Sequence, residues 1–566
     1  MKENDSRNSK TILSWIFSVA GKKKKYICYL IILQLIVGAG GVLSALILRQ
    51  MIDAAVKGNA GDFRNSCLMF AGILLLQIVV KAGIRFLEEF TRADMENEFK
   101  GCLFGNLLNR EYASVSGIHS EEWMNRLTSD TVVVADGLVQ ILPGLACMLM
   151  KMAAAFAAIL ALEVSLAYIL IPGAILLMFT TYGFRRILKK LHKNIQEADG
   201  KLRVFMQEHL GSLVIVKTFS KEQSALDEAV EKMALHKRAR MKRNHFSNLC
   251  NVGFAMAMNG VYLLGAVFCG YGILHGTMSY GTFVAITQLI GQVQNPLANI
   301  TGYFPKYYAM LASGERMQEA EGFQIDATEK KSVGVIRGFY EQDFKGFGIE
   351  NASFTYQDGQ MVLHNLNLNI QKGEYVAFTG TSGCGKSTLL KLLMCLYSLD
   401  AGERYMLSEN DKIMLDSSWR GLYAYVPQGN QLMSGTIREI IMFSDKKAMK
   451  NEEKLQWALK IACADEFVSE LDQGLETELG ERGMGLSEGQ MQRIAIARAV
   501  FSEHPILMLD EATSSLDEVT ERKVLENLRT MTDKTVLIVT HRLAVLDICD
   551  KQVEMSGGEV KIGRLR

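Results

Sequence analysis

The chain has 566 residues, of which 49% are apolar types and 22% are charged, and its mean hydropathy is +0.10. Lysine and arginine number 62 against 61 aspartate and glutamate residues, so the net charge of +1 indicates no overall attraction to nucleic acid. With 49 glycines and only 6 prolines, the composition excludes disordered, collagen-like and low-complexity chains. It indicates a membrane protein or an unusually large core.

Six apolar stretches are long enough to cross a bilayer as helices, which takes about 20 residues each. The expected spans are Tyr26–Leu48, Phe63–Ile84, Leu138–Leu162, Val164–Phe184, Phe246–Leu274 and Tyr280–Tyr303. Four lysines at 22–25 precede the first span, and basic residues at 185, 186, 189 and 190 follow the fourth. Because cytoplasmic loops are enriched in lysine and arginine, we expect a plasma (inner) membrane protein with both ends in the cytoplasm.

Two long connections, residues 88–128 and 185–245, are charged and free of proline. We expect them to continue the spans as helices that extend ~40 Å beyond the membrane, with a separate soluble insertion as the alternative. Thr11–Ala20 is apolar on one side and is expected to form an amphipathic helix in the membrane interface.

From about Gly346 the pattern changes to short strand-like runs that alternate with helical stretches. The runs EYVAFTG, PILMLD and TVLIVT are continuously apolar, which is typical of buried parallel strands in an α/β domain. Residues 311–345 are charged and lack a clear period, so we expect a linker there. The predicted order is a cytoplasmic N-terminus (1–25), an all-α six-helix transmembrane domain (26–310), the linker, and an α/β domain (346–566).

The strongest motif is Gly380-Thr-Ser-Gly-Cys-Gly-Lys-Ser387, which matches G-x-x-x-x-G-K-[ST] between a strand and a helical segment. In such a loop backbone N–H groups wrap phosphates, Lys386 reaches the β- and γ-phosphates, and Ser387 can bind Mg²⁺. Downstream, Asp510 ends the strand PILMLD and suits a water-mediated hold on Mg²⁺, while Glu511 is placed to activate the attacking water. The last domain is therefore expected to be a P-loop NTPase that binds ATP and Mg²⁺.

Further motifs make the last 220 residues resemble the nucleotide-binding domain of ATP-binding cassette (ABC) transporters. Leu486-Ser-Glu-Gly-Gln490 resembles the family's signature sequence, AYVPQ its Q-loop, Ser514-Ser-Leu-Asp517 its D-loop and VTHR its switch-histidine motif. The six spans resemble the transmembrane domain of type IV exporters. SGIHSEEWMNRLTSD and QEHLGSLVIVKTFSKEQ resemble the turns that carry coupling helices, the second reaching the partner's cassette; alternatively, Trp123 and Phe219 are buried anchors of the helical bundle.

The resemblance implies roles for individual residues. Glu511 would be the general base, His541 would steady the γ-phosphate, and Gln428 and Lys386 would assist catalysis. The residues expected to bind MgATP within the chain are Tyr356, which stacks on adenine, and Gly380, Thr381, Ser382, Gly383, Cys384, Gly385, Lys386, Ser387, Thr388, Gln428 and Asp510. Ser387, Gln428 and Asp510 would hold the Mg²⁺. Because Cys384 lies inside the phosphate loop, we expect thiol alkylation to block nucleotide binding.

The resemblance also implies a dimer, because Ser487, Gly489 and Gln490 of one chain would complete the site of another. The expected partner is a second half-transporter in the lipid bilayer. The signature has Glu488 where the common family form has glycine, which leaves homodimer and heterodimer both open. Residues 403–421 match the usual segment before the Q-loop poorly.

The cargo is open among small molecules such as drugs, lipids and peptides. Gln288, Gln292, Asn295 and Asn299 share one helix face and either line a wet cavity or hydrogen-bond between helices. Lys81 and Lys151 within the second and third spans suggest an acidic or amphipathic cargo; the alternative is that Lys81 extends toward the cytoplasmic interface. The sequence thus predicts ATP-hydrolysis-driven export of an amphipathic substrate, with no nucleic-acid partner. The alternative is an ATP-gated regulator or sensor of the same fold without net transport.

Overall fold

The computed structural model describes residues 2–326, 329–356, 359–409, 411–429, 432–444, 451–480, 483, 485–556 and 559–565. For residues 2–10, 166–186, 189, 298 and 301 the description covers the backbone alone. The chain divides into two compact units. The first comprises residues 1–104 and 124–318, and the second comprises residues 105–123 and 319–566.

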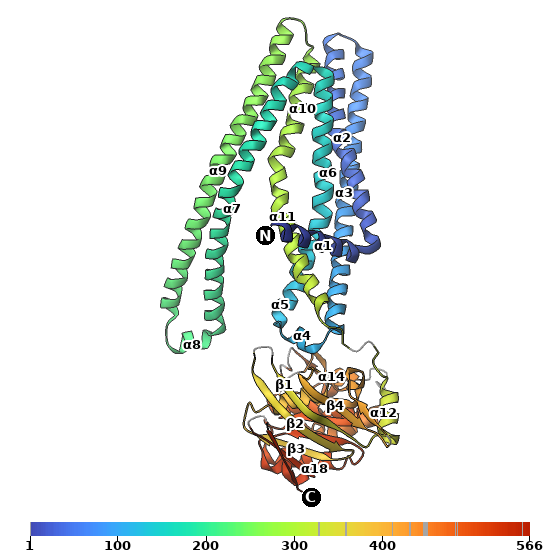
Figure 1. Ribbon diagram of the computed structural model, residues 1–566. Helices are drawn as coiled ribbons and strands as arrows, with labels where there is room; N and C mark the ends of the chain where they lie inside the picture. Colours follow the sequence, from blue (N-terminus) through green and yellow to red (C-terminus); the bar gives the residue numbers. More distant parts are fainter. Residues whose placement is uncertain are drawn as a thin grey trace. The chain divides into compact units, whose positions relative to one another are not determined.

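Long helices make up the first unit (Figure 1). They are α1 (Lys2–Ala20), α2 (Lys24–Val56), α3 (Ala60–Asn109), α6 (Thr131–Leu162), α7 (Ala167–Gly211), α9 (Glu222–Leu274), α10 (Tyr280–Asn299) and α11 (Tyr303–Gln318), with the short α8 (Leu213–Thr218) between α7 and α9. At 1.5 Å per residue, the 53 residues of α9 extend about 80 Å, well beyond the ~30 Å of a bilayer core. The two long charged connections are therefore mostly helical, with breaks at residues 110–111 and 117–119 in the first and at residues 212 and 219–221 in the second.

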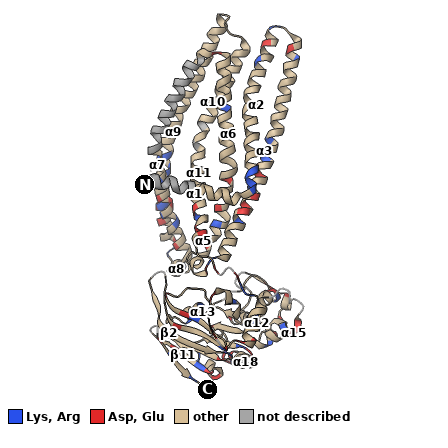
Figure 2. Ribbon diagram, turned by 45° about the vertical axis from the view of Figure 1, so that its right-hand side comes forward, with Lys and Arg blue, Asp and Glu red and all other residues tan. Residues whose placement is uncertain are grey.

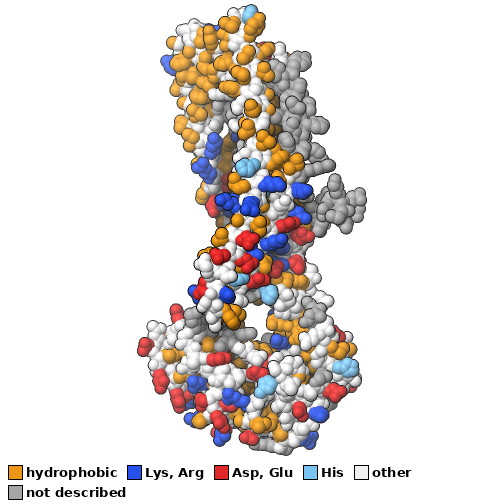
Figure 3. Space-filling view, turned by 90° about the vertical axis from the view of Figure 1, so that its left-hand side faces the viewer, with side chains coloured by type: hydrophobic (Ala, Val, Ile, Leu, Met, Phe, Trp, Pro, Cys, Tyr) orange, Lys and Arg blue, Asp and Glu red, His pale blue; other side chains and the backbone are white. Residues whose placement is uncertain are grey.

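Among the described residues, four helical stretches are long and apolar enough to cross a membrane. They are Thr11–Val56, Ala60–Asn109, Ser120–Leu162 and Glu222–Leu274. The side chains of the predicted fourth span fall almost entirely outside the described residues, and the predicted sixth span is the polar-faced helix α10. Figure 3 shows that hydrophobic side chains dominate one end of the helical unit on this face, and that charged side chains of both signs gather beyond them.

Helix α1 packs its apolar side on other helices of the unit. Ile12, Trp15, Ile16 and Ala20 repeat at helical spacing and are buried. A Cβ added to Gly314 of α11 would lie 2.9 Å from Ile16, and the Trp15 ring lies 6.3 Å from Phe99 of α3. The amphipathic pattern read from the sequence is thus explained in large part by contact with protein.

The second unit is built on three sheets. Its strands are β1 (Gly346–Thr355), β2 (Met361–Gln371), β3 (Tyr375–Gly380), β4 (Ala401–Leu407), β5 (Lys412–Met414), β6 (Tyr423–Val426), β7 (Gly435–Thr436), β8 (Glu478–Leu479), β9 (Ile506–Asp510), β10 (Thr535–Val539), β11 (Lys551–Ser556) and β12 (Glu559–Arg564). The main sheet has the order β12-β11-β3-β10-β9-β6, parallel except for β12. A second, antiparallel sheet has the order β2-β1-β4-β5.

Helices and the second sheet cover both faces of the main sheet. The helices are α13 (Lys386–Leu393), α14 (Ile437–Ile441), α15 (Glu452–Ile461), α16 (Asp465–Glu470), α17 (Glu488–Phe501) and α18 (Glu518–Arg529). Successive residues of β3 enter opposite cores: Ala377 packs with α14 to α18, whereas Val376 and Phe378 pack with β1, β2 and α13. Burial on both faces explains why EYVAFTG, PILMLD and TVLIVT are apolar throughout.

The stretch predicted as a linker contains ordered structure of both units. Helix α11 continues to Gln318, and α12 covers Val333–Gln342, with the Ser332 side chain accepting a hydrogen bond from the Val335 N–H at its start. Ile336 and Tyr340, one helical turn apart, are buried in the core of the second unit. The two anchors are hard to recognise in sequence because charged residues surround them.

Residues 105–123 fold with the second unit even though they follow α3 in the chain. This segment ends α3 and includes α4 (Tyr112–Ser116) and the start of α5 (Ser120–Asn125). Its backbone pairs with the residues after α11: Glu111 N–H donates to Gln324, and Asp326 N–H donates to Asn109. The Tyr112 ring meets Tyr397 edge-on at 5.8 Å.

Candidate nucleotide-binding and hydrolysis site

The phosphate loop joins β3 to α13 through conformations that suit glycine. Gly380, Gly383 and Gly385 have φ of 141°, 80° and 102°. A Cβ on Gly380 would lie 2.2 Å from the Met555 carbonyl oxygen, and one on Gly385 would lie 2.6 Å from Val362. The backbone can therefore follow this path only with glycine at these two positions.

Lys386 begins helix α13 and folds back over the loop. Its Nζ donates hydrogen bonds to the carbonyl oxygens of Gly380 and Thr381, 3.0 Å each, and lies 3.9 Å from Cys384 Sγ. The side chain is 5% exposed. Its ammonium group therefore lies inside the loop, as the motif predicts for a phosphate-binding lysine.

Asp510 lies at the carboxyl end of β9, beside the loop. Its Oδ1 accepts a hydrogen bond from Ser387 Oγ at 2.9 Å, and its Oδ2 accepts one from the Tyr425 hydroxyl at 3.0 Å. Burial raises the pKa of Asp510, while the hydrogen bonds from Ser387 and Tyr425 act in the opposite direction. The structure thus brings together the hydroxyl and carboxylate that the sequence assigned to one site.

Glu511 follows directly and meets two other predicted catalytic side chains. Its Oε2 accepts a hydrogen bond from Gln428 Nε2 at 2.7 Å, and its Oε1 lies 3.2 Å from His541 Nε2. Its backbone has φ of 51°, a left-handed conformation that costs a residue with a side chain about 1 kcal/mol or more. The three side chains converge from the ends of β9, β6 and β10.

Tyr356, the predicted adenine-stacking residue, lies beside the phosphate-loop helix. Its hydroxyl and that of Thr388 are 2.9 Å apart, and its ring meets those of Phe354 and Tyr397 at 5.0 and 5.6 Å. Thr381, Ser382, Gly383 and Cys384 form the turn of the loop itself.

The signature residues form the start of α17. Ser487 and Gln490 make a capping box: the Gln490 N–H donates to Ser487 Oγ, and the Ser487 N–H donates to Gln490 Oε1. A Cβ on Gly489 would lie 2.9 Å from the Ser515 carbonyl oxygen, so glycine allows this helix to approach the D-loop. One turn later, Gln492 Nε2 donates to the hydroxyls of Ser514 and Ser515 at 3.0 and 3.3 Å.

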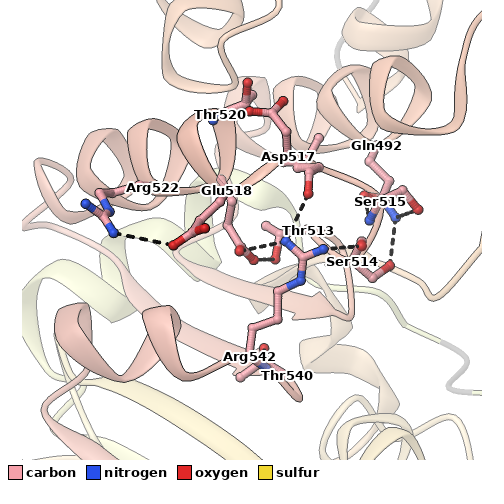
Figure 4. Close-up of polar contacts among 12 residues, drawn as sticks. Gln492, Thr513, Ser514, Ser515, Asp517, Glu518, Thr520, Arg522, Thr540 and Arg542 are labelled. Carbon is pink, nitrogen blue, oxygen red and sulfur yellow. Dashed lines mark hydrogen bonds and ion pairs between the residues drawn. The ribbon is translucent and has the colours of Figure 1, made fainter.

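Arg542, the last residue of the VTHR motif, has a place in the site that the motif does not predict. It follows His541 and reaches the D-loop, where its guanidinium donates to the carbonyl oxygens of Ser514 and Leu516 at 2.6 and 2.9 Å (Figure 4). It also donates to Glu521 Oε2 at 2.7 Å. The Glu521 side chain is 2% exposed and accepts a further hydrogen bond from Thr513.

The two predicted coupling turns differ in burial. Trp123 is 6% exposed, its ring meets Phe323 edge-on at 6.0 Å, and its Nε1 donates to the Val115 carbonyl oxygen. Phe219, beside α8, is 69% exposed. Trp123 is therefore a buried anchor, but its contacts with Phe323 and Val115 lie in the second unit and not in the helical bundle, and for Phe219 the buried-anchor interpretation is wrong.

The poorly matching segment before the Q-loop contains a second residue without an assigned role. Arg420 donates to both carboxylate oxygens of Asp326, at 2.5 and 3.2 Å, and to the carbonyl oxygens of Met394 and Cys395 after α13. This contact ties the segment between α11 and α12 to the phosphate-loop helix.

Taken together, the fold and the site define a membrane-spanning protein with a P-loop nucleotide hydrolase domain. Two family models match the chain: the ABC transporter transmembrane region over residues 27–297 and the ABC transporter model over residues 363–514. The chain belongs to the ABC transporter family. It is a multi-pass membrane protein that binds ATP, an ATPase coupled to transport.

Relatives match along nearly the whole chain. An uncharacterized ABC transporter ATP-binding protein of Bacillus subtilis is 29% identical over 92% of this chain and 91% of its own length. A Staphylococcus aureus protein named as a multidrug export ATP-binding/permease protein is also 29% identical, over 92% and 90%. The structure of a bacterial Atm1-family ABC exporter with ATP bound has the same fold, with a TM-score of 0.79, 22% identity, and coverage of 96% of this chain and 95% of that one.

Proposed function

We propose that this chain is one half of a dimeric exporter that uses ATP hydrolysis to move an amphipathic molecule out of the cell. The observation that carries this proposal is the convergence of Glu511, His541 and Gln428 next to the phosphate loop. A regulator that only senses ATP has no need of a general base for turnover. The same chain contains the apolar helices through which a cargo would cross.

In the proposed reaction Glu511 accepts a proton from the attacking water, and Gln428 and His541 hold its carboxylate in position from either side. Lys386 and the N–H groups of residues 380–388 bind the phosphates, and His541 steadies the γ-phosphate. Tyr356 provides a ring for the adenine. The Glu511 carboxylate, which would accept the proton, contacts Gln428 through one oxygen and His541 through the other. These two contacts favour a single orientation of the Glu511 side chain.

Mg²⁺ fits the chemistry of the proposed site. Ser387 provides a hydroxyl and Asp510 a carboxylate, and the two are hydrogen-bonded to each other. Gln428 is hydrogen-bonded to Glu511, the residue after Asp510. Among the described residues there is no cluster of three His, Cys, Asp or Glu side chains able to hold a metal ion alone. Mg²⁺ characteristically binds through one or two protein ligands together with substrate phosphates. When bound, it would neutralise the charge that develops on the phosphates.

A partner is proposed because each chain has one copy of every motif. The Ser487 cap, Gly489 and Gln490 would close on ATP held by the phosphate loop of the other half, whether this is an identical chain or a different one. Helix α8 supports the proposal, because Val214, Ile215 and Phe219 at this tip are 78%, 59% and 69% exposed. We propose that this apolar tip docks on the partner's nucleotide-binding domain.

The proposed orientation places the nucleotide-binding domain and both chain ends in the cytoplasm of a plasma (inner) membrane, in agreement with the lysines at 22–25. For the cargo, the multidrug names of several relatives favour an amphipathic drug-like molecule. A lipid or a peptide has the same amphipathic character.

The deciding test is the ATPase rate of this chain, purified alone and reconstituted in lipid, with Glu511→Gln as the blank. Glu511-dependent turnover would support a competent homodimer, and ATP binding without turnover would point to a different second half. Transport of ethidium into sealed inside-out vesicles then distinguishes exporter from sensor. ATPase activity without ATP-dependent uptake of ethidium, of labelled lipid or of labelled peptide would contradict the export proposal.

A further inference from the structure

A pocket of about 680 Å³ lies where α1 turns into α2. Its walls are apolar and come from three helices: Phe17 at the end of α1, Ile27, Cys28 and Ile31 on α2, and Leu142 on α6. Gly21, with φ of 52°, makes the turn between the two helices and also lines the pocket. None of the residues that line this pocket belongs to the nucleotide site described above.

Lysines surround the same pocket. Lys22, Lys24 and Lys25 all line it and are exposed. Lys23, between them, turns to α3 and pairs with Asp94 and Glu98 at 2.7 and 2.9 Å. Within the part of the chain that the structure describes, no carboxylate pairs with the other three. Figure 2 shows Lys and Arg gathered where α1 runs into α2.

The pocket lies beside the start of the first apolar span, where lipid head groups would meet the hydrocarbon of a membrane. Lys25 directly precedes Tyr26, where the first apolar span begins, and the Lys25 ammonium group lies 5.0 Å from the Tyr26 ring. Tyrosines are enriched at this level of the membrane, and lysines next to a span attract anionic lipids. Of the lining residues, Leu142 is 41% exposed, so part of the apolar wall faces outward from the helices.

We propose that this pocket binds one anionic phospholipid, with an acyl chain along Ile27, Ile31 and Leu142 and the phosphate on Lys22, Lys24 and Lys25. Both halves of the ligand are required by the site. A free phosphate would leave the apolar wall uncovered, and a zwitterionic lipid would offer the three lysines little net charge. Charge complementarity and the apolar wall therefore favour the same occupant.

The test measures lipid binding to the purified full chain by native mass spectrometry, with phosphatidylglycerol and phosphatidylcholine of identical acyl chains. Each lysine near an anionic head group adds about fivefold in affinity, so three predict a preference of up to about 100-fold for phosphatidylglycerol. The triple variant K22Q/K24Q/K25Q should lose this preference. The matched control K221Q/K237Q/K242Q removes three exposed lysines from the α9 region and should keep it.

A second variant, Leu142→Trp, leaves every charge in place and fills the pocket. It should lower phosphatidylglycerol binding at least tenfold, whereas soluble glycerol 3-phosphate should fail to compete. Equal retention of the two lipids, or equal loss in both triple variants, would overturn the proposal. Full competition by glycerol 3-phosphate would also overturn it, because the site would then bind a free anion. Unchanged binding in Leu142→Trp would exclude the pocket as the place of the acyl chain.

Discussion

Two neighbouring carboxylates at the end of β9 have opposite environments. Asp510 is 1% exposed and accepts hydrogen bonds from Ser387 and Tyr425, whereas the Glu511 side chain is 22% exposed and faces Gln428 and His541. The left-handed backbone of Glu511 turns the second side chain out of the strand's alternation. Asp510 is therefore suited to holding a cation in a fixed position, and Glu511 to accepting and releasing a proton.

Tyr425 is expected to set the lower pH limit of activity. Burial raises the pKa of its hydroxyl, which therefore remains a donor to Asp510. Tyr425→Phe removes a hydrogen bond that lowers the pKa of Asp510, so that pKa rises and the carboxylate is lost at a higher pH as the solution is acidified. The acid limb of the ATPase pH profile should move to higher pH, with little change at pH 8. An unmoved acid limb in a folded variant would contradict this role.

Arg542 is expected to be a positioning residue for the D-loop and the switch histidine. Arg542→Met leaves the buried Glu521 carboxylate without its cation. Because the Arg542 side chain is 38% exposed, we expect a loss of about 2 kcal/mol in stability, less than for a fully buried pair. The ATPase rate should fall about tenfold at saturating ATP while KM changes little, because contacts to the D-loop are lost.

The double variant Arg542→Met/Glu521→Met separates position from stability. It should recover the melting temperature and leave the rate low. Arg522→Met provides the matched control, since Arg522 lies 3.7 Å from Glu518 on the exposed side of α18 and should matter little (Figure 4). A double variant with the wild-type rate would show that Arg542 acts through stability alone.

The phosphate loop, Asp510 and Glu511 could be predicted from the sequence because each lies in a contiguous motif whose residue types follow from the chemistry of binding phosphate, Mg²⁺ and water. It could not predict the Arg542–Glu521 pair, because the partners lie 21 residues apart on separate elements. Arg420 and Asp326 are 94 residues apart, and the segment around Arg420 matches its family poorly. Contacts of this kind depend on the folded path of the chain.

At the level of elements, the phosphate-loop helix is connected to a membrane helix by a short series of contacts. Arg420 bonds the backbone after α13 and also the Asp326 carboxylate, and the Asp326 N–H bonds Asn109 at the end of α3. Six helices were predicted from apolar runs of suitable length, which is a local property. Residues 105–123 and α12 belong to the second unit through contacts with residues that are distant in sequence. Such contacts cannot be read from apolar runs, so the predicted domain boundaries do not assign these segments to that unit.

The Arg420–Asp326 pair is expected to couple hydrolysis to transport. Asp326→Asn keeps the shape and loses the charge, so the backbone contact to α3 should loosen while the phosphate loop stays intact. Ethidium transported per ATP hydrolysed should fall at least about fivefold, with ATP affinity unchanged. Glu409→Gln, which removes an exposed pair with Lys345 in the same unit, should have no effect. Equal transport per ATP in Asp326→Asn and wild type would exclude the coupling.

For the whole molecule, the proposed composite sites predict how much ATPase activity a dimer of two different inactive variants should have. Lys386→Ala disables the phosphate loop of its own chain. Ser487→Asp keeps a good helix cap and places a negative charge against the partner's ATP. Each variant alone should be inactive, yet a mixed dimer contains one site in which both the loop and the signature are intact.

Co-expression of Lys386→Ala and Ser487→Asp chains with different affinity tags, followed by purification through both tags, should therefore recover about half of the wild-type ATPase rate per dimer if the sites act independently. Cooperation between the sites would give a lower but measurable rate. Activity that remains at the level of either single variant would show that each site is completed within one chain.

The place of residues 105–123 also bears on how this protein can be divided. Part of the surface of the nucleotide-binding unit is supplied by chain that lies between the second and third membrane-spanning segments, some 200 residues earlier than the rest. If the chain were cut before residue 319, the remaining nucleotide-binding unit would lose Tyr112 and Trp123. The ring of Tyr397, which contacts Tyr112, and the ring of Phe323, which contacts Trp123, would then be uncovered. Gene fusions, swaps and truncations that treat the two halves as interchangeable modules would separate a surface from the residues that cover it.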